Sequence, residues 1–146
     1  MSRQWITPIT DRSNIDISRR TPKGYLNVVD IRRIESNIAY LSEQLREHGF
    51  RSDVATPNEW SKDDIVKVSD LESIRDSIIS IMETYYMLDE HARALQAITF
   101  ESLNFTNVND IERTMFDLHR LLTSTESITN LSWAMGMAHT GLYVSV

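Results

Sequence analysis

Cysteine is absent from this 146-residue chain. Disulfide bonds, thiolate metal sites and cysteine nucleophiles are therefore excluded. Long apolar runs are also missing: no stretch approaches the roughly 18 residues that span a bilayer, and the N-terminus lacks the apolar core of a secretory signal. We expect a protein that stays in a soluble phase and does not bind a membrane. One domain is the default expectation for this length, since such a chain can bury a core without metals or disulfides.

An excess of positive charge is missing too. The net charge is −6, which argues against nucleic acid as a partner, because neutralising phosphates requires clustered lysine and arginine. The charge is unevenly distributed. Residues 1–24 hold five bases and two acids, or +3, so the other 122 residues carry −9. A basic N-terminal segment thus precedes an acidic body.

Recognisable catalytic patterns are lacking as well. The sequence has no glycine-rich phosphate loop, nucleophile elbow or zinc-protease helix motif. The four histidines lie far apart and form no metal pair at helical spacing: His48, His91, His119 and His139. We therefore expect no enzymatic activity, no cofactor and no metal.

A repeat with a period of 40 residues is the main feature that is present. Asp30, Asp70 and Asp110 lie 40 residues apart, and each opens an amphipathic run. The spacing of three and four residues within each run places apolar side chains on one helical face. These positions are Ile31, Ile34, Ile38, Leu41 and Leu45, then Leu71, Ile74, Ile78, Ile81 and Tyr85, then Ile111, Thr114, Met115, Leu118, Leu121 and Leu122. The sequence thus predicts three copies of one helix.

The predicted helices cover residues 29–47, 69–87 and 108–122, the last running on toward residue 130. Residues 91–98 either extend the second helix or form a separate one, and residues 56–63 can include one helical turn begun by a Thr-Pro pair. The first helix is expected to stop at Gly49, which favours the left-handed conformation that ends helices. We expect one small bundle within residues 25–130, with these side chains inside: Ile34, Ile38, Leu41, Ile74, Ile78, Ile81, Leu118 and Leu121.

Helix starts are marked by possible capping boxes. Ser69 with Glu72 and Asn109 with Glu112 have the required spacing. In the first copy Val29 occupies the cap position and cannot cap, so Asp30 would be the cap itself or an acid in the first turn. The three repeated aspartates could also be metal ligands. Because helix starts favour acids in any case, we expect three separate helix ends.

The first predicted helix also carries charged residues of both signs. Arg32, Arg33 and Arg46 could contact a phosphate group. Glu35 and Glu43 on the same helix instead indicate a solvated face of mixed charge. We expect that solvated face.

Residues 1–24 show no helical or strand periodicity and contain two prolines, which indicates an extended arm. The arm carries more apolar anchors than a free tail needs, so we expect it to dock on the chain's own body or on a neighbouring subunit. We further expect it to be ordered only in an assembly. The residues predicted to make this interaction are Trp5, Ile6, Pro8, Ile9 and Arg12.

Residues 131–146 form a tail of small, aromatic and β-branched residues. The final LYVSV suits a strand, but a single strand has no partner in a helical chain. A strand edge invites pairing with another chain. We therefore predict a second attachment segment that uses Leu142, Tyr143 and Val144.

Four sequence motifs carry a family resemblance. They are W-I-T-P-I-T-D-R at 5–12, K-G-Y-L-N-x-x-D-x-x-R-I-E-x-N-I-x-Y-L at 23–41, W-x-x-x-D-I at 60–65 and L-N-F-T-x-x-N-D-I-E at 103–112. Together they resemble small structural proteins encoded in the tail-gene regions of phages and prophages of Gram-positive bacteria. Val29 departs from the pattern, since the relatives favour a capping residue there.

The resemblance implies a virion protein of the tail or baseplate, assembled in the bacterial host cytoplasm and contacting other virion proteins. The two attachment segments suggest a connector present as a homo-oligomer or multicopy ring. Alternatives are a head fibre or decoration protein, or a cytosolic helical regulator that binds a host protein. The family carries no catalytic residues that could be assigned here.

Overall fold

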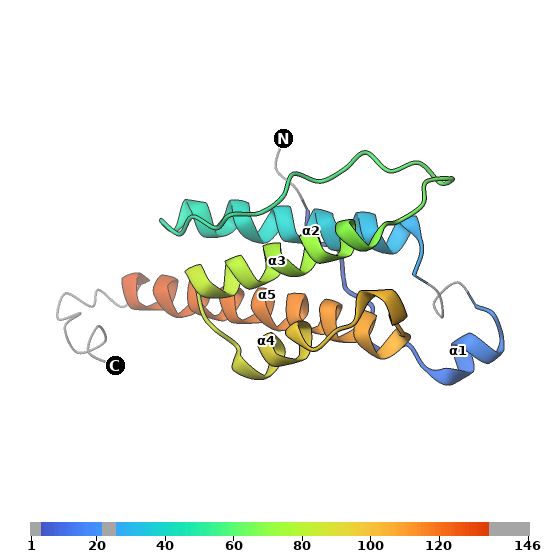
Figure 1. Ribbon diagram of the computed structural model, residues 1–146. Coiled ribbons are helices and arrows are strands. Elements are labelled where there is room, and N and C mark those ends of the chain that lie inside the picture. The colour runs from blue at the N-terminus through green and yellow to red at the C-terminus, as the bar shows by residue number, and fades with distance from the viewer. Residues whose placement is uncertain (1–3, 22–25, 135–146) are drawn as a thin grey trace. The chain divides into compact units, whose positions relative to one another are not determined.

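The computed structural model describes residues 4–21 and 26–134, with side chains up to Ser124. The fold is mainly α-helical, a small helical bundle, as the repeat predicts (Figure 1). The chain forms two compact units, Met1–Phe116 and Asp117–Val146, and each is described by itself. The helices in order are α1 (Asn14–Ser18), α2 (Val28–Glu47), α3 (Val68–Thr84), α4 (Asp89–Gln96), the 3₁₀ turn η2 (Phe100–Ser102) and α5 (Phe105–Ala134).

The repeated apolar positions are buried except for Tyr85 and Leu121, which are half-buried. α3 contacts α2, α4 and η2, so the second copy of the repeat packs against elements on two sides. Every predicted core side chain except Leu121 is buried. Leu121 is half-buried, so the prediction for it is wrong. The buried stripe of α5 runs through Met115, Leu118 and Leu122, at spacings of three and four residues, and Leu121 lies beside it.

The start of α2 corrects the predicted cap. The helix begins at Val28, and Asn27 is its cap. The Asn27 side-chain oxygen accepts a hydrogen bond from the Asp30 backbone N–H at 3.2 Å, and the Asp30 carboxylate accepts one from the Asn27 N–H at 3.1 Å. This reciprocal pair is a capping box whose cap lies two positions before the expected position, Val29. Val29 lies inside the first turn and is exposed.

The second and third starts also differ from the predicted boxes. α3 begins at Val68, and the Lys67 N–H donates to the Asp70 carboxylate at 2.9 Å. The period of 40 therefore holds between Asp30 and Asp70. α5 begins three residues before the corresponding position, where Asn104 and Asn107 each donate a backbone N–H to the other's side-chain oxygen. Asp110 is thus inside a helix, and its assignment as a helix start is wrong.

Segments between the helices resolve two open points. Residues 89–96 form the separate helix α4, since α3 ends at Thr84. Residues 51–61 have no regular secondary structure, and the expected helical turn at 56–63 is reduced to a turn at residues 62–63, closed by the Asp64 N–H, which donates to the Ser61 carbonyl. α2 ends as predicted: the N–H of Gly49 donates to Arg46 and that of Phe50 to Leu45, with Gly49 at φ +90°. This pair of backbone hydrogen bonds is a Schellman motif.

The extended connection lies along α2 and α3, held by side chains of both helices. The Ala55 N–H donates to the Ser77 hydroxyl at 3.0 Å and the Asp53 N–H to the Ser80 hydroxyl at 2.8 Å. Glu35 accepts from the Trp60 indole N–H and from the Asn58 N–H. Glu35 is buried, so the predicted solvated face of this helix is wrong at that position.

Candidate functional site

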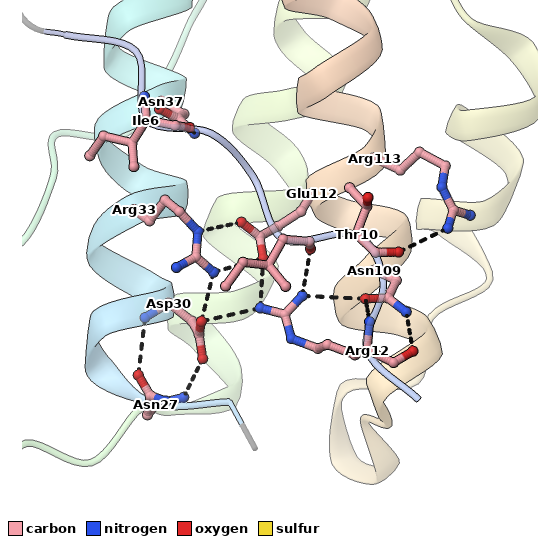
Figure 2. Close-up of polar contacts among 11 residues, drawn as sticks. Ile6, Thr10, Arg12, Asn27, Asp30, Arg33, Asn37, Asn109, Glu112 and Arg113 are labelled. Carbon is pink, nitrogen blue, oxygen red and sulfur yellow. Dashed lines mark hydrogen bonds and ion pairs between the residues drawn. The ribbon is translucent and has the colours of Figure 1, made fainter. Parts of the chain in front are cut away.

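The N-terminal arm packs on the helices of its own chain. Residues 5–12 pass α2 and the first turns of α5, and the contacts come from side chains on both helices (Figure 2). Two asparagines bind the arm backbone and one buried arginine fixes its end. We call these residues, with the carboxylates they meet, the arm-docking cluster: Arg12, Asp30, Arg33, Asn37, Asn109 and Glu112.

Asn37 of α2 holds the arm at Ile6. Its side-chain amide donates to the Ile6 carbonyl at 2.7 Å, and its oxygen accepts from the Ile6 N–H at 3.0 Å. A primary amide can replace one peptide group of a neighbouring strand in this way. Next to this pair, the rings of Trp5 and Tyr40 lie 5.8 Å apart between centroids, tilted by 52°. The backbone N–H and C=O of Ile6 thus find hydrogen-bond partners without a neighbouring β-strand.

Asn109 of α5 makes the same pair of bonds six residues further along the arm. Its side chain donates to the Arg12 carbonyl at 3.0 Å and accepts from the Arg12 N–H at 3.1 Å. Arg113 on the next turn of the helix donates to the Thr10 carbonyl at 3.1 Å. Because α5 begins at Phe105, Asn109 lies one turn inside the helix and faces the arm rather than capping the helix.

Arg12 brings a charge into this contact. Its side chain is almost fully buried, with 1% of its surface exposed. The guanidinium donates to Glu112 at 2.6 Å, to Asp30 at 3.1 Å and to the Ile9 carbonyl at 2.7 Å. Only its Nε–H is buried without a hydrogen-bond partner among the described side chains. A buried charge is tolerated only when it is paired in this way.

Arg33 supplies the second positive charge of the cluster and pairs with both carboxylates, Asp30 and Glu112. It donates to Glu112 in a bidentate arrangement at 2.6 and 2.8 Å, and to Asp30 at 2.6 Å. Burial lowers the pKa of Arg33, but the hydrogen bonds that Arg33 donates to the Glu112 and Asp30 carboxylates, together with their negative charges, outweigh this effect, so the pKa lies above its ordinary value. While Glu112 and Asp30 are ionised, the stability that the Arg33 charge contributes is present below its ordinary pKa and is lost when the pH rises through the raised pKa. Arg33 therefore stays charged throughout the neutral range.

The cluster is balanced, with two arginines and two carboxylates. Glu112 accepts from Arg12 and Arg33 and so joins the arm, α2 and α5 at a single carboxylate. Charge-assisted and bidentate bonds are the strong ones, and they fix direction as well as distance. The chemistry that this arrangement supports is positioning: it fixes residues 5–12 relative to the two helices.

The structure corrects one expectation for the arm and locates most of its predicted contact residues. Residues 5–12 lie on the helices of their own chain, and the expectation that the arm becomes ordered only in an assembly stays a prediction. Residues 14–18 form the helix α1, so the expectation of an extended arm is wrong there. Trp5 and Ile9 are half-buried, Pro8 and Arg12 are buried, and Ile6 keeps its side chain exposed. The predicted tail residues lie outside the described residues: Leu142, Tyr143 and Val144.

The sequence reasoning missed the partners of the arm. Arg33 was interpreted as part of a solvated face, and Asn109 and Glu112 as a capping box. One signal in the sequence could have indicated these partners. The D-x-x-R-I-E-x-N pattern at 30–37 places polar residues beside core positions, and a buried apolar stripe does not by itself require them. Polar residues at fixed spacing beside core positions indicate specific partners.

Comparison with protein-family models, curated proteins and solved structures yields no match. In the described part of the chain, no group of three or more acidic or histidine side chains is arranged to hold a metal ion. No described helix is long and apolar enough to cross a membrane.

Replacing Asn37 by alanine tests the first backbone clamp. We expect a loss of about 1–3 kcal/mol of unfolding free energy, because both Ile6 backbone groups lose their partners in a half-buried place. Amide hydrogen exchange should accelerate at Ile6. Asn58→Ala is the control: it removes an exposed amide that also donates to a buried carboxylate, and it should leave exchange at Ile6 unchanged. Unchanged exchange at Ile6 in Asn37→Ala would contradict the clamp.

Proposed function

We propose that this chain is a non-enzymatic structural protein of a phage tail or tail-like particle, a tail or baseplate connector present in several symmetric copies. Its partners are other virion proteins and further copies of itself. It works without cofactor or metal and binds neither nucleic acid nor membrane. It is assembled in the bacterial host cytoplasm and resides in the virion.

A single observation carries the proposal: the four motifs behind the resemblance form one connected network. Arg12 of the first motif binds Asp30 of the second and Glu112 of the fourth. Trp60 of the third motif donates to Glu35 of the second. Residues separated by up to 100 positions thus meet in pairs. Such motifs specify one way of folding the arm and the extended connection onto helices, which supports a shared fold with the tail-region proteins.

The docked arm changes how attachment would work. Trp5 and Arg12 contact side chains of α2 and α5, so they are not the groups offered to a different virion protein. The arm residues beyond them remain available: α1 has no buried residue, and its Ile15 is 61% exposed. We assign the arm's contact with a neighbouring virion protein to Ile15 and Ile17 of α1. The tail keeps its proposed role as the second attachment.

Mass spectrometry of purified particles is the direct test. We expect the chain to be present in intact particles in a fixed ratio to the tail proteins, because a connector is a stoichiometric component. Abundance in the cell together with absence from particles would contradict the proposal and favour the regulator of a host protein. Location in tail-less heads would instead favour the fibre or decoration alternative.

Two exposed isoleucines offer a matched comparison within this test. Ile15→Ser should abolish incorporation, while Ile65→Ser, at a side chain that is 83% exposed in the extended connection, should not. Both changes should leave the melting temperature nearly unaltered, since surface substitutions shift stability by only about 0.5 kcal/mol or less. Equal incorporation of the two variants would count against the attachment role of α1.

A further inference from the structure

The turn after α1 lies between the docked arm and α2 along the chain, and it holds Arg20 at φ +54°. The N–H of Arg20 donates to Ile17, and that of Thr21 to Asp16. This is the same Schellman pattern as at the end of α2, where Gly49 occupies the left-handed position. An arginine there carries the steric cost that glycine avoids. The turn at Arg20 is therefore strained.

The groove under the arm is specific for one kind of occupant. Without Arg12, the buried groups left are Asp30, Glu112 and Arg33, with a net charge of −1. Asn37 and Asn109 would each lack two backbone partners. An occupant must bring a guanidinium, and extended backbone six residues before it. The arm of a second copy of this chain meets all of these requirements.

We propose that this chain exchanges its arm between copies, with residues 19–21 as the hinge and the groove of one copy holding residues 5–12 of another. All contacts of the arm-docking cluster are the same within a chain and between chains. The balance then depends on strain in the hinge and on the effective concentration of the two arms. Strained hinges favour this kind of exchange.

Exchange would supply the link between neighbouring copies in a multicopy connector. In this respect the inference rests on the proposed function and deepens it. Each subunit would then offer two different surfaces: its own arm, which binds the next subunit, and its arm-binding surface, which receives the arm of the previous one. A ring of subunits requires two such surfaces. Because Arg12 and its carboxylates are buried, an exchanged arm should leave slowly once it is seated.

A pair of substitutions at the exposed Arg20 tests the hinge in the purified full-length chain. Arg20→Gly relieves the strain, and Arg20→Val increases it, because a β-branched residue strongly disfavours positive φ. After refolding at high protein concentration, sedimentation velocity should show a dimer-to-monomer ratio at least about fivefold higher for Arg20→Val than for Arg20→Gly. The parent chain should lie between them.

An isotope-filtered nuclear Overhauser experiment on a refolded mixture of labelled and unlabelled chains identifies the contact. We expect a signal between Trp5 of one chain and Tyr40 of the other, the aromatic pair that lies in contact in the docked arm. Three results would overturn the proposal: no dimer at any concentration, an equal dimer fraction in the two variants, or a dimer in which the Trp5 to Tyr40 signal stays within one chain. Since the test needs no particle, it can fail while the virion role stands.

Discussion

Glu112→Gln should be the most damaging single change in the arm-docking cluster, with a loss of about 3–5 kcal/mol of unfolding free energy. Glu112 is 1% exposed and accepts hydrogen bonds from both arginines. The amide keeps the shape but leaves Arg12 and Arg33 buried with only Asp30 as a counter-charge. Removing one member of a buried ionic group costs far more than the intact group contributes, because the remaining charge is uncompensated. Urea unfolding at neutral pH measures the difference.

Glu72→Gln is the matched control, an exposed glutamate on α3 that should change stability by less than about 0.5 kcal/mol. The double variant Arg12→Met/Glu112→Met removes one charge of each sign and leaves Asp30 paired with Arg33. It should cost clearly less than the sum of the two single changes, since the residues are in contact. A Glu112→Gln protein within about 1 kcal/mol of the parent would show that the cluster does not hold the arm.

Ile78→Ala is expected to cost about 2–5 kcal/mol. Ile78 is fully buried on α3, the helix that contacts α2, α4 and η2. The lost methyl and methylene groups remove transfer free energy and leave a cavity that close-packed neighbours fill only partly. Thermal and urea unfolding report the change.

Ile65→Ala deletes the same groups from an exposed side chain and serves as the control. It should alter the unfolding free energy by less than about 0.5 kcal/mol. If both alanine variants melt like the parent, the repeat-derived core is wrong. If both lose stability equally, Ile65 is buried by something other than this chain's described residues.

The apolar periodicity was sufficient to predict the helices, for a local reason. Spacing of three and four residues has one simple structural solution, a helix with a buried face, so Ile34, Ile78 and Leu118 could be assigned to the core from their own neighbours in sequence. Helix ends were less certain. Asn27 and Asn104 were overlooked because a capping residue is recognised only relative to a start, and the strict period of 40 placed the third start three residues too late.

The sequence by itself thus determined the helical class, the three apolar faces and the stop at Gly49, but not the helix α1 within the arm. Only the tertiary structure decided what the polar residues do. Arg12, Asp30, Arg33 and Glu112 each have an ordinary surface explanation in sequence, as arm charge, first-turn acid, solvated face and capping box. Their role depends on partners up to 100 positions away, and the attraction within a buried ion pair offsets the cost of removing water from both charges only when folding aligns their hydrogen bonds. No local pattern carries that information.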